Sequence, residues 1–439
     1  MNEDADAQKT DNKLDVVELL LTCECYNAHT ELDAHDLPSP IRVHYWDTRA
    51  KGVPRPVSVC EKDVRDIYGV PDVRGVCAQL PFIERTEFGE QISLTVMKLA
   101  IIWFIKSGGL DRIIRNPAIA HHCEKEGVRG AEGITYAESL NNIPPLHSER
   151  VWVNSMLDEV RAEYGDEAEE MLKLCVMSSP DEITITLDEL VLTPRQYEVI
   201  SKMVAAIKNR EYLAEIGLYD VGKMLFVGVP GTGKTSTARA LSRRLKLPLL
   251  EVRLSMVTNQ YLGETSKNID RVFELARRLE PCILFIDEFD FVAKTRTSDE
   301  HAAIKRAVNT LLKAIDEISL VRHGVLLIGA TNHPQLLDVA AWRRFDEVVR
   351  FLLPDEKMRG EILKKITSRI KGDFDIKEVA ALTEGFSGSD LRMVVREAVL
   401  SNLKENKKEL TQESLRCAVE EFSMREGAKA GVVEEADLA

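Results

Sequence analysis

The segment GVPGTGKT at positions 228–235 has the residue types and the spacing of a phosphate-binding loop. Its glycines let backbone N–H groups curl around phosphate oxygens, and the N-terminus of a following helix adds positive charge. From this loop the Lys234 ammonium can reach the β- and γ-phosphates, and the Thr235 hydroxyl can complete the shell of a Mg²⁺ ion. The sequence therefore predicts that the chain binds ATP and Mg²⁺. The loop residues expected to contact the nucleotide are Gly228, Val229, Pro230, Gly231, Thr232, Gly233, Lys234, Thr235 and Ser236.

A pair of carboxylates could supply the metal and water chemistry. The apolar run 282–286 ends in Asp287 and Glu288. Such a run capped by two acids is by itself more often a solvated strand end, but beside a phosphate-binding loop it indicates a nucleotide hydrolase. We expect Asp287 to bind Mg²⁺ mainly through its waters, because this ion dehydrates reluctantly. We expect Glu288 to polarise the attacking water.

Three polar residues further along the chain could complete the site. Asn332 follows another apolar run and can hold the water and the γ-phosphate without adding charge, although an Asn in such a turn often serves only the turn. Arg343 and Arg344 stand just before the apolar run 347–353. Two adjacent surface arginines usually form a solvated face. The functional alternative is an arginine finger, which supplies positive charge to the transition state at a neighbouring subunit's ATP.

The elements that must position these residues form an alternating pattern. Short apolar runs at 223–227, 247–254, 282–287 and 324–330 are separated by amphipathic helical patterns. This alternation is typical of buried parallel strands covered by helices on both faces. From position 355 onward the strand-like runs stop and helical patterns follow. We therefore expect an α/β core with a small helical domain behind it.

The order of these motifs resembles that of the AAA ATPase family, closest in style to the protein-remodelling clade that includes proteasomal unfoldases, katanin and spastin. The resemblance covers roughly residues 190–425. It implies a P-loop NTPase fold, in which a parallel αβα sheet is followed by a small helical lid. The segment GFSGSDL at 385–391 matches the turn that opens a lid helix, so Gly388 and Ser389 are expected beside the adenine and ribose.

The resemblance also implies an assembly. Asn332 matches the family's sensor position, and the arginine pair matches its finger positions, where an arginine acts on the ATP of the next subunit. Many relatives have RPGRFD where this chain has AWRRFD at 341–346, which leaves open whether Arg343 or Arg344 is the finger. We expect a homo-hexamer, and we expect Arg344→Ala to spare ATP binding but to lose turnover.

The work done with ATP is indicated by the segment NQYLGE at 259–264. It resembles the family's pore loop, with Tyr261, Leu262 and Gly263 facing the central channel of the ring. An aromatic ring can grip an extended polypeptide by apolar contact, and the glycine lets the loop move. The alternative is a tyrosine that anchors its loop on the core. The segment 295–301 occupies the place of a second pore loop. The resulting prediction is a ring ATPase that unfolds or remodels protein clients by threading them through its pore.

Two other classes of function are alternatives to protein remodelling. A nucleic-acid motor or loader could use the same ATPase core, but the chain has a net charge of -14, and an acidic surface repels phosphate backbones. Tyr261 also stands where such motors tend to place a basic residue. A scaffold that binds ATP without turning it over would not need Glu288, Asn332 and both arginines.

The chain before the ATPase region resembles no family that we can name. By position only, it is expected to select protein clients or adaptors, and its fold is expected to be mixed or mainly helical. The expected domains are a disordered tail at 1–12, the N-terminal domain at 13–185, the ATPase core at 190–354, the lid at 355–425 and a disordered tail at 426–439.

Cysteine and histidine residues gather in the N-terminal half. Cys23, Cys25, His29 and His35 are close in sequence, but their spacing is not a standard zinc pattern, and the triplet at 121–123 is equally loose. Core or surface roles are the better interpretation. The chain has eight cysteines without small-domain spacing, no signal-peptide pattern, and no run of roughly 18–20 apolar residues. We therefore expect a cytoplasmic protein without a membrane partner.

Overall fold

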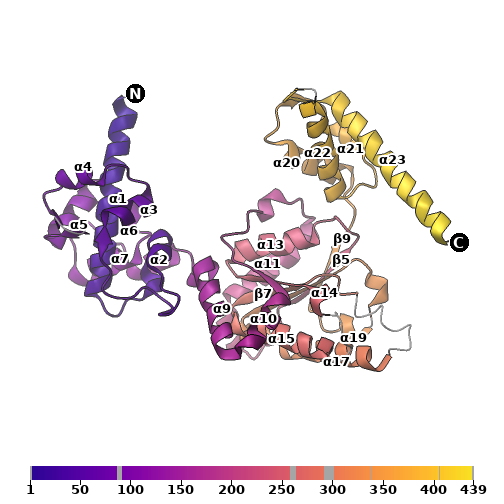
Figure 1. Cartoon of the computed structure of the whole chain (residues 1–439), viewed down its shortest axis with the longest axis horizontal. Helices are drawn as coiled ribbons and strands as arrows, with labels where there is room; N and C mark the ends of the chain where they lie inside the picture. Colours follow the sequence, from indigo (N-terminus) through magenta and orange to yellow (C-terminus); the bar gives the residue numbers. More distant parts are fainter. Residues whose placement is uncertain are drawn as a thin grey trace. The chain divides into compact units, whose positions relative to one another are not determined.

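The computed structural model describes residues 2–86, 91–257, 264–290, 301–337, 339–404 and 406–437. The chain divides into two compact units, Met1–Ala162 and Glu163–Ala439 (Figure 1). The phosphate-binding loop, the carboxylate pair, Asn332 and the arginine pair all belong to the second unit.

A six-stranded sheet forms the core of the second unit, in the order β4-β6-β7-β8-β5-β9. The strands from β5 to β9 pair in parallel, whereas the edge strand β4 pairs antiparallel with β6. The residues of β7 and β8 are all buried, because helices cover both faces of the sheet. The predicted parallel α/β fold is thereby confirmed. The strands are β4 (Cys175–Ser178), β5 (Lys223–Gly228), β6 (Leu249–Val252), β7 (Cys282–Ile286), β8 (Val325–Thr331) and β9 (Glu347–Phe351).

Helices flank this sheet on two sides (Figure 1). On one side, apolar residues of α11 and α13, among them Val199 and Leu241, pack with Phe226 and Phe351 of the sheet in one buried cluster. Figure 1 shows α15 and α17 on the other side. The helices around the sheet are α10 (Asp166–Lys173), α11 (Pro194–Lys208), α12 (Arg210–Glu215), α13 (Lys234–Leu245), α14 (Leu254–Val257), α15 (Glu264–Arg278), α17 (His301–Glu317), α18 (Leu320–His323) and α19 (Val339–Trp342).

A helical lid follows the sheet, as the sequence predicts. Its helices close around their own apolar cluster, which includes Leu363, Leu391 and Val394. A short parallel strand pair, absent from the sequence prediction, links the two connections of the lid. The lid elements are α20 (Glu356–Thr367), β10 (Gly372–Asp373), α21 (Ile376–Leu382), α22 (Gly388–Lys404), β11 (Leu410–Thr411) and α23 (Gln412–Asp437).

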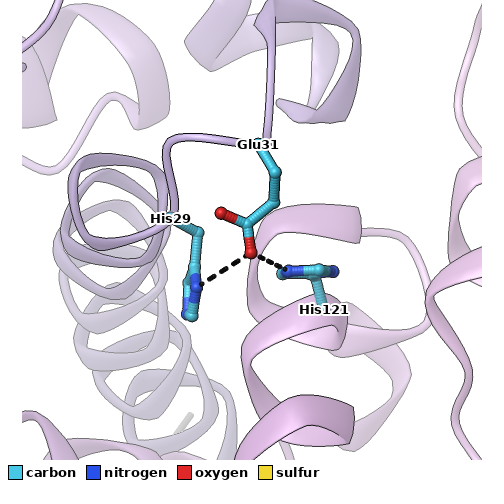
Figure 2. A group of neighbouring side chains, drawn as sticks. All are labelled: His29, Glu31 and His121. Carbon is cyan, nitrogen blue, oxygen red and sulfur yellow. Dashed lines mark hydrogen bonds and ion pairs between the residues drawn. The ribbon is translucent and has the colours of Figure 1, made fainter.

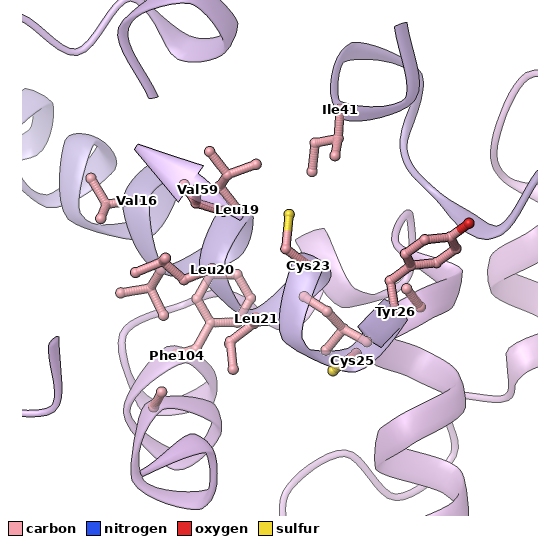
Figure 3. Close-up of a cluster of buried hydrophobic side chains, with 14 of the residues drawn as sticks. Val16, Leu19, Leu20, Leu21, Cys23, Cys25, Tyr26, Ile41, Val59 and Phe104 are labelled. Carbon is pink, nitrogen blue, oxygen red and sulfur yellow. The ribbon is translucent and has the colours of Figure 1, made fainter. Parts of the chain in front are cut away.

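The first unit is mainly helical, with a small antiparallel sheet in the order β1-β3-β2. Its long first helix passes through the core, so that residues such as Leu19, Leu20 and Leu21 are all buried, and Phe104 of α5 packs in the same cluster (Figure 3). The elements are α1 (Asn2–Ala28), α2 (Ser39–Tyr45), β1 (Val59–Cys60), α3 (Glu61–Tyr68), α4 (Val73–Ala78), β2 (Ile83–Arg85), β3 (Gln91–Leu94), α5 (Met97–Lys106), α6 (Leu110–Ile113), α7 (Pro117–Glu126) and α8 (Tyr136–Asn141); α9 (Arg150–Tyr164) crosses the unit boundary.

The buried thiols Cys23 and Cys25 belong to that core (Figure 3). Burial raises the pKa of both thiols far above the ordinary range, so the thiolate that a zinc ion needs is disfavoured at these positions. His35 lies on a short 3-10 turn and is partly exposed. Cys23, Cys25, His29 and His35 therefore do not form one metal site.

The division of the chain differs from the expected boundaries. It falls between Ala162 and Glu163 rather than at the end of 13–185, because β4 adds to the ATPase sheet beside β6. The expected tails also differ, since α1 begins at Asn2 and α23 continues to Asp437. The stretch 426–439 is rich in Ala and Glu, which are good helix formers, whereas the stretch 1–12 is rich in Asp. Within the described residues, no helix is long and apolar enough to span a membrane.

Candidate nucleotide site

The phosphate-binding loop joins strand β5, which lies between β8 and β9, to helix α13. Gly231 and Gly233 have φ of 77° and 100°, a left-handed conformation that glycine adopts without a steric penalty. Helix α13 begins at Lys234, directly after the loop. The Lys234 ammonium is buried and donates to the carbonyl oxygens of Gly228 at 2.7 Å and Val229 at 2.9 Å. The ammonium is thus held inside the loop that would surround the phosphates.

Burial and two nearby carboxylates have opposite effects on the pKa of the Lys234 ammonium. Burial lowers the pKa of the ammonium, and the nearby carboxylates of Asp287 and Asp290 oppose that shift. A buried cation that is only partly balanced favours the arrival of an anion such as a triphosphate.

The predicted metal ligands lie side by side. Thr235 Oγ1 donates to Asp287 Oδ2 at 2.9 Å, although the two residues belong to different elements. A hydroxyl and a carboxylate are the hard oxygen donors that Mg²⁺ prefers, so these residues fit the ion that the family implies.

Glu288 has an unusual backbone at the end of β7. Its φ is 50°, a left-handed conformation that costs a non-glycine residue about 1–2 kcal/mol. Its N–H donates to Asp287 Oδ1 at 2.8 Å, and its side chain is exposed. Backbone strain of this kind is concentrated at functional sites. The Glu288 carboxylate, next to the predicted metal ligand Asp287, is exposed to solvent rather than used in packing.

Two buried residues that sequence reasoning missed align the neighbouring strand ends. Thr331 Oγ1 donates to Asp290 Oδ1 at 3.0 Å, and the N–H of Phe289 donates to the carbonyl oxygen of Ala330 at 2.8 Å. These bonds fix the end of β8, from which Asn332 follows, beside the end of β7. The strand order β7-β8-β5 then brings Asp287, Asn332 and the phosphate-binding loop to one edge of the sheet. In the sequence, only the position of Asp290 three residues after Asp287 could indicate its role.

The lid contacts the loop directly. The N–H of Ser389 donates to the carbonyl oxygen of Gly231 at 3.1 Å. Ser387 Oγ lies 3.0 Å from Ser389 Oγ and donates to Asp390 Oδ2 at 2.8 Å, so the turn that opens α22 is internally bonded. Gly388 and Ser389 therefore lie next to the phosphate-binding loop, and their contact with the adenine and ribose stays a prediction.

A pocket of about 540 Å³ opens beside this contact. Its wall includes Thr232 of the loop and Gly388 of the lid, together with apolar side chains from α11, β9 and α20. A pocket of this size and apolar character suits a nucleobase and its sugar. Val191, Val199, Met358 and Ile362 contribute to the wall and were not predicted. No local motif marks such residues, because they contribute only shape.

The two arginines have different surroundings. Arg344 Nε donates to the carbonyl oxygen of Leu312 at 3.2 Å, and Arg344 Nη2 forms an ion pair with Asp316 at 3.0 Å. These partners belong to α17 of the same chain. Arg343, one residue earlier, is exposed. The structure thus uses one guanidinium to hold its own helix and leaves the other facing solvent.

Comparison with known proteins identifies the family. Residues 224–353 match the ATPase family associated with various cellular activities (AAA), and residues 373–417 match the AAA+ lid domain. An uncharacterised AAA family ATPase, y4kL, from Sinorhizobium fredii is 36% identical over 244 residues, which are 55% of this chain and 73% of that protein. The chain belongs to the AAA ATPase family. As a member of this family it is an ATP-hydrolysing enzyme.

Other relatives are matched over smaller shares of their own length. Proteasome-activating nucleotidase from Methanosarcina mazei is 32% identical over 260 residues, 57% of this chain and 61% of that protein. Spastin from Ixodes scapularis is 36% identical over 225 residues, 50% of this chain and 34% of that protein. The crystal structure of the FIGL-1 AAA domain superposes with a TM-score of 0.49 and 24% identity, over 57% of this chain and 88% of that one.

The predicted pore-loop residues Tyr261, Leu262 and Gly263 lie outside the described residues, as do residues 295–300 of the second loop. The elements on either side of the first loop are α14 and α15. In the order of the chain, the first loop therefore falls between β6 and β7.

Gly231→Ala is expected to weaken ATP binding by at least about 10-fold. An added Cβ would lie 2.2 Å from Ser389 Oγ and 2.5 Å from Ser387 Oγ, and the left-handed backbone alone costs alanine about 1–2 kcal/mol, where 1.4 kcal/mol is a factor of ten in affinity. Gly385→Ala is the matched control, since its φ is +79° but nothing lies within 4 Å. Titration with a fluorescent ATP analogue measures both, and equal affinities for the two variants would contradict a direct lid contact.

Proposed function

We propose that this AAA ATPase assembles into a ring, as a homo-hexamer, and uses ATP to unfold or remodel protein clients that it threads through a central pore. The observation that carries the catalytic part is the hydrogen bond between Thr235 and Asp287, with the exposed Glu288 beside it and Lys234 buried in the loop. Relatives named proteasome-activating nucleotidase and spastin support the choice of protein clients.

The chemistry follows from the side chains at this edge of the sheet. Bound Mg²⁺ would neutralise charge on the β- and γ-phosphates, and Thr235 and Asp287 are the residues that would hold it. Lys234 would bind the phosphate oxygens. Glu288 would accept a proton from the attacking water, and the Asn332 amide would orient that water. Gly388 and Ser389 would hold the ribose side of the nucleotide near the lid.

The ring completes the site. Arg343 is exposed and available to a neighbouring subunit's ATP, whereas Arg344 is engaged with Asp316 of its own chain. We therefore assign the finger to Arg343 and a supporting role to Arg344, which positions the short segment between α17 and β9. An isolated subunit should hydrolyse ATP slowly, and its activity should rise with protein concentration.

Tyr261→Ala is expected to keep ATP hydrolysis within about a few-fold of wild type and to abolish client processing. The aromatic ring supplies the apolar grip on the client but does not contact the nucleotide in the proposed mechanism. Tyr261→Phe is the matched control, because it keeps the ring and should keep processing. Loss of a fluorescent signal from an unfolding client measures processing, and an Ala variant that still processes clients would exclude pore threading.

The first unit is proposed to select those clients or adaptors in the cytoplasm. A Glu288→Gln protein isolated with ATP should retain one defined partner, and that partner should be lost when residues 1–162 are deleted. The competing assignment is a nucleic-acid motor. It would be favoured if DNA or RNA stimulated ATP hydrolysis in a salt-dependent manner.

A further inference from the structure

Two segments that are far apart in the sequence bring two histidines and a glutamate together in the first unit (Figure 2). His29 and Glu31 follow the end of α1, and His121 lies on α7. Glu31 Oε1 is 3.1 Å from His121 Nε2 and 3.6 Å from His29 Nδ1. One ligand atom from each of the three residues lies within 4.8 Å of the others. This arrangement is separate from the ATPase unit and has no part in the proposed mechanism.

The turn that carries His29 and Glu31 is fixed by an arginine. Arg55 donates to the carbonyl oxygen of His29 at 3.1 Å and to that of Thr30 at 3.2 Å, and also to the carbonyl oxygens of Tyr26 and Leu32. Its guanidinium lies over the Tyr26 ring, 3.9 Å from the centroid. Because one side chain satisfies several carbonyls of this turn, the two ligands on it are held in place before anything binds.

The imidazole of His29 is oriented by a second histidine. His29 Nε2 lies 2.9 Å from His122 Nδ1. In the tautomer that donates from Nε2, His29 presents the lone pair of Nδ1 toward Glu31 and His121. A hydrogen bond from the second ring nitrogen is the usual partner of a metal-binding histidine, because it fixes both the tautomer and the ring direction.

The charges also suit a cation. The Glu31 carboxylate already attracts the Lys125 ammonium, and its Oε1 also faces His121 Nε2, so this oxygen is placed to bind a positive charge.

The ammonium of Lys125 lies where a bound metal ion would contact Glu31. Lys125 Nζ lies 2.6 Å from the same Glu31 Oε1 that faces both histidines, and its side chain is 52% exposed. A flexible, half-exposed ammonium can move into solvent when a stronger cation arrives. Lys125 therefore lowers the affinity of the site without blocking it.

We propose that His29, Glu31 and His121 bind one divalent transition-metal ion of the Zn²⁺ class, with water at the open positions. Two imidazole nitrogens and one carboxylate select Zn²⁺, Co²⁺ or Ni²⁺ over Mg²⁺ and Ca²⁺, which prefer oxygen ligands alone. The ion would join the end of α1 to α7. This site does not include Cys23 and Cys25, which lie in the apolar core.

The test is a titration of the nucleotide-free full-length chain with Zn²⁺ against a chromogenic chelator, in the absence of Mg²⁺. All proteins carry Cys417→Ser, because Cys417 is an exposed thiol that would bind zinc on its own. Glu31→Gln and His121→Ala remove ligands near the surface, where folding is least affected. His147→Ala is the matched control, a histidine of the same unit outside the cluster.

We expect the wild type and the His147→Ala control to bind one equivalent of Zn²⁺, and each ligand variant to bind at least about 10-fold more weakly, the smallest loss that even a second-shell change causes. Lys125→Met should bind more tightly than wild type, because it removes the competing ammonium. Co²⁺ should give visible d–d absorption that His121→Ala loses. The site is refuted if wild type binds no Zn²⁺, if His121→Ala binds it equally well, or if Lys125→Met binds no more tightly.

Discussion

Arg343→Ala is expected to lower the ATP turnover of the assembled protein by about 10³–10⁵-fold, the range that an arginine finger contributes in phosphoryl transfer. The affinity for ATP should stay within about a few-fold of wild type, because the guanidinium acts on the transition state and is supplied by the neighbouring subunit. The physical reason for choosing this residue is its exposure next to an arginine that already has intrachain partners. Steady-state hydrolysis and equilibrium binding of a fluorescent ATP analogue measure the two effects separately.

Arg344→Ala is the matched control. It removes the ion pair to Asp316 and the bond to the Leu312 carbonyl, so we expect lower thermal stability and an activity loss no larger than the loss of assembled protein. The sequence alone favoured the opposite assignment, with turnover lost on replacing Arg344. If Arg344→Ala loses turnover while remaining assembled, and Arg343→Ala does not, the finger is Arg344.

Glu288→Gln should lower turnover by about 10²–10⁴-fold, as expected when a general base is removed, and should leave ATP bound. The amide has the shape of the carboxylate but cannot accept a proton from water, whereas Lys234, Thr235 and Asp287 remain to hold the phosphates and the metal. Nucleotide retained on the purified protein, measured after denaturation, should be ATP rather than ADP.

Glu317→Gln, on the exposed end of α17, is a control for the loss of one negative charge. It should turn over ATP at the wild-type rate. A Glu288→Gln protein that hydrolyses ATP as fast as this control would show that another group activates the water.

The parts of the site that the sequence predicts are those that local patterns encode. The loop at 228–235, Asp287 with Glu288, and the lid turn at 385–391 each combine residue types that are needed together within a few positions. Their common location follows from parallel strands, whose carboxyl ends lie at one edge of the sheet. The structure adds the bond from Ser389 to Gly231, which no spacing indicates, because it depends on how the lid folds back.

What the sequence could not predict depends on pairing between distant segments. The strand β4 lies just before Pro180, in a proline-containing stretch, and pairs antiparallel with β6 at the sheet edge. No local pattern indicates this pairing, because it depends on a partner more than 70 positions further along the chain. In the first unit, Arg42 and Glu149 are far apart in the sequence, yet both are buried and Arg42 Nε donates to Glu149 Oε2 at 2.9 Å. The same holds for His29 and His121, because the local spacing of histidines and cysteines suggested a different set of partners.

Mixing two inactive variants tests the central claim most directly, namely that each ATP site is completed by a neighbouring subunit. Arg343→Ala subunits keep an intact Lys234, Asp287 and Glu288, and Glu288→Gln subunits keep an intact Arg343. After the two are unfolded and refolded together, or exchanged in the absence of nucleotide, mixed rings should regain ATP hydrolysis well above the sum of the separate proteins. Activity no higher than that sum, in rings shown to contain both variants, would contradict the account.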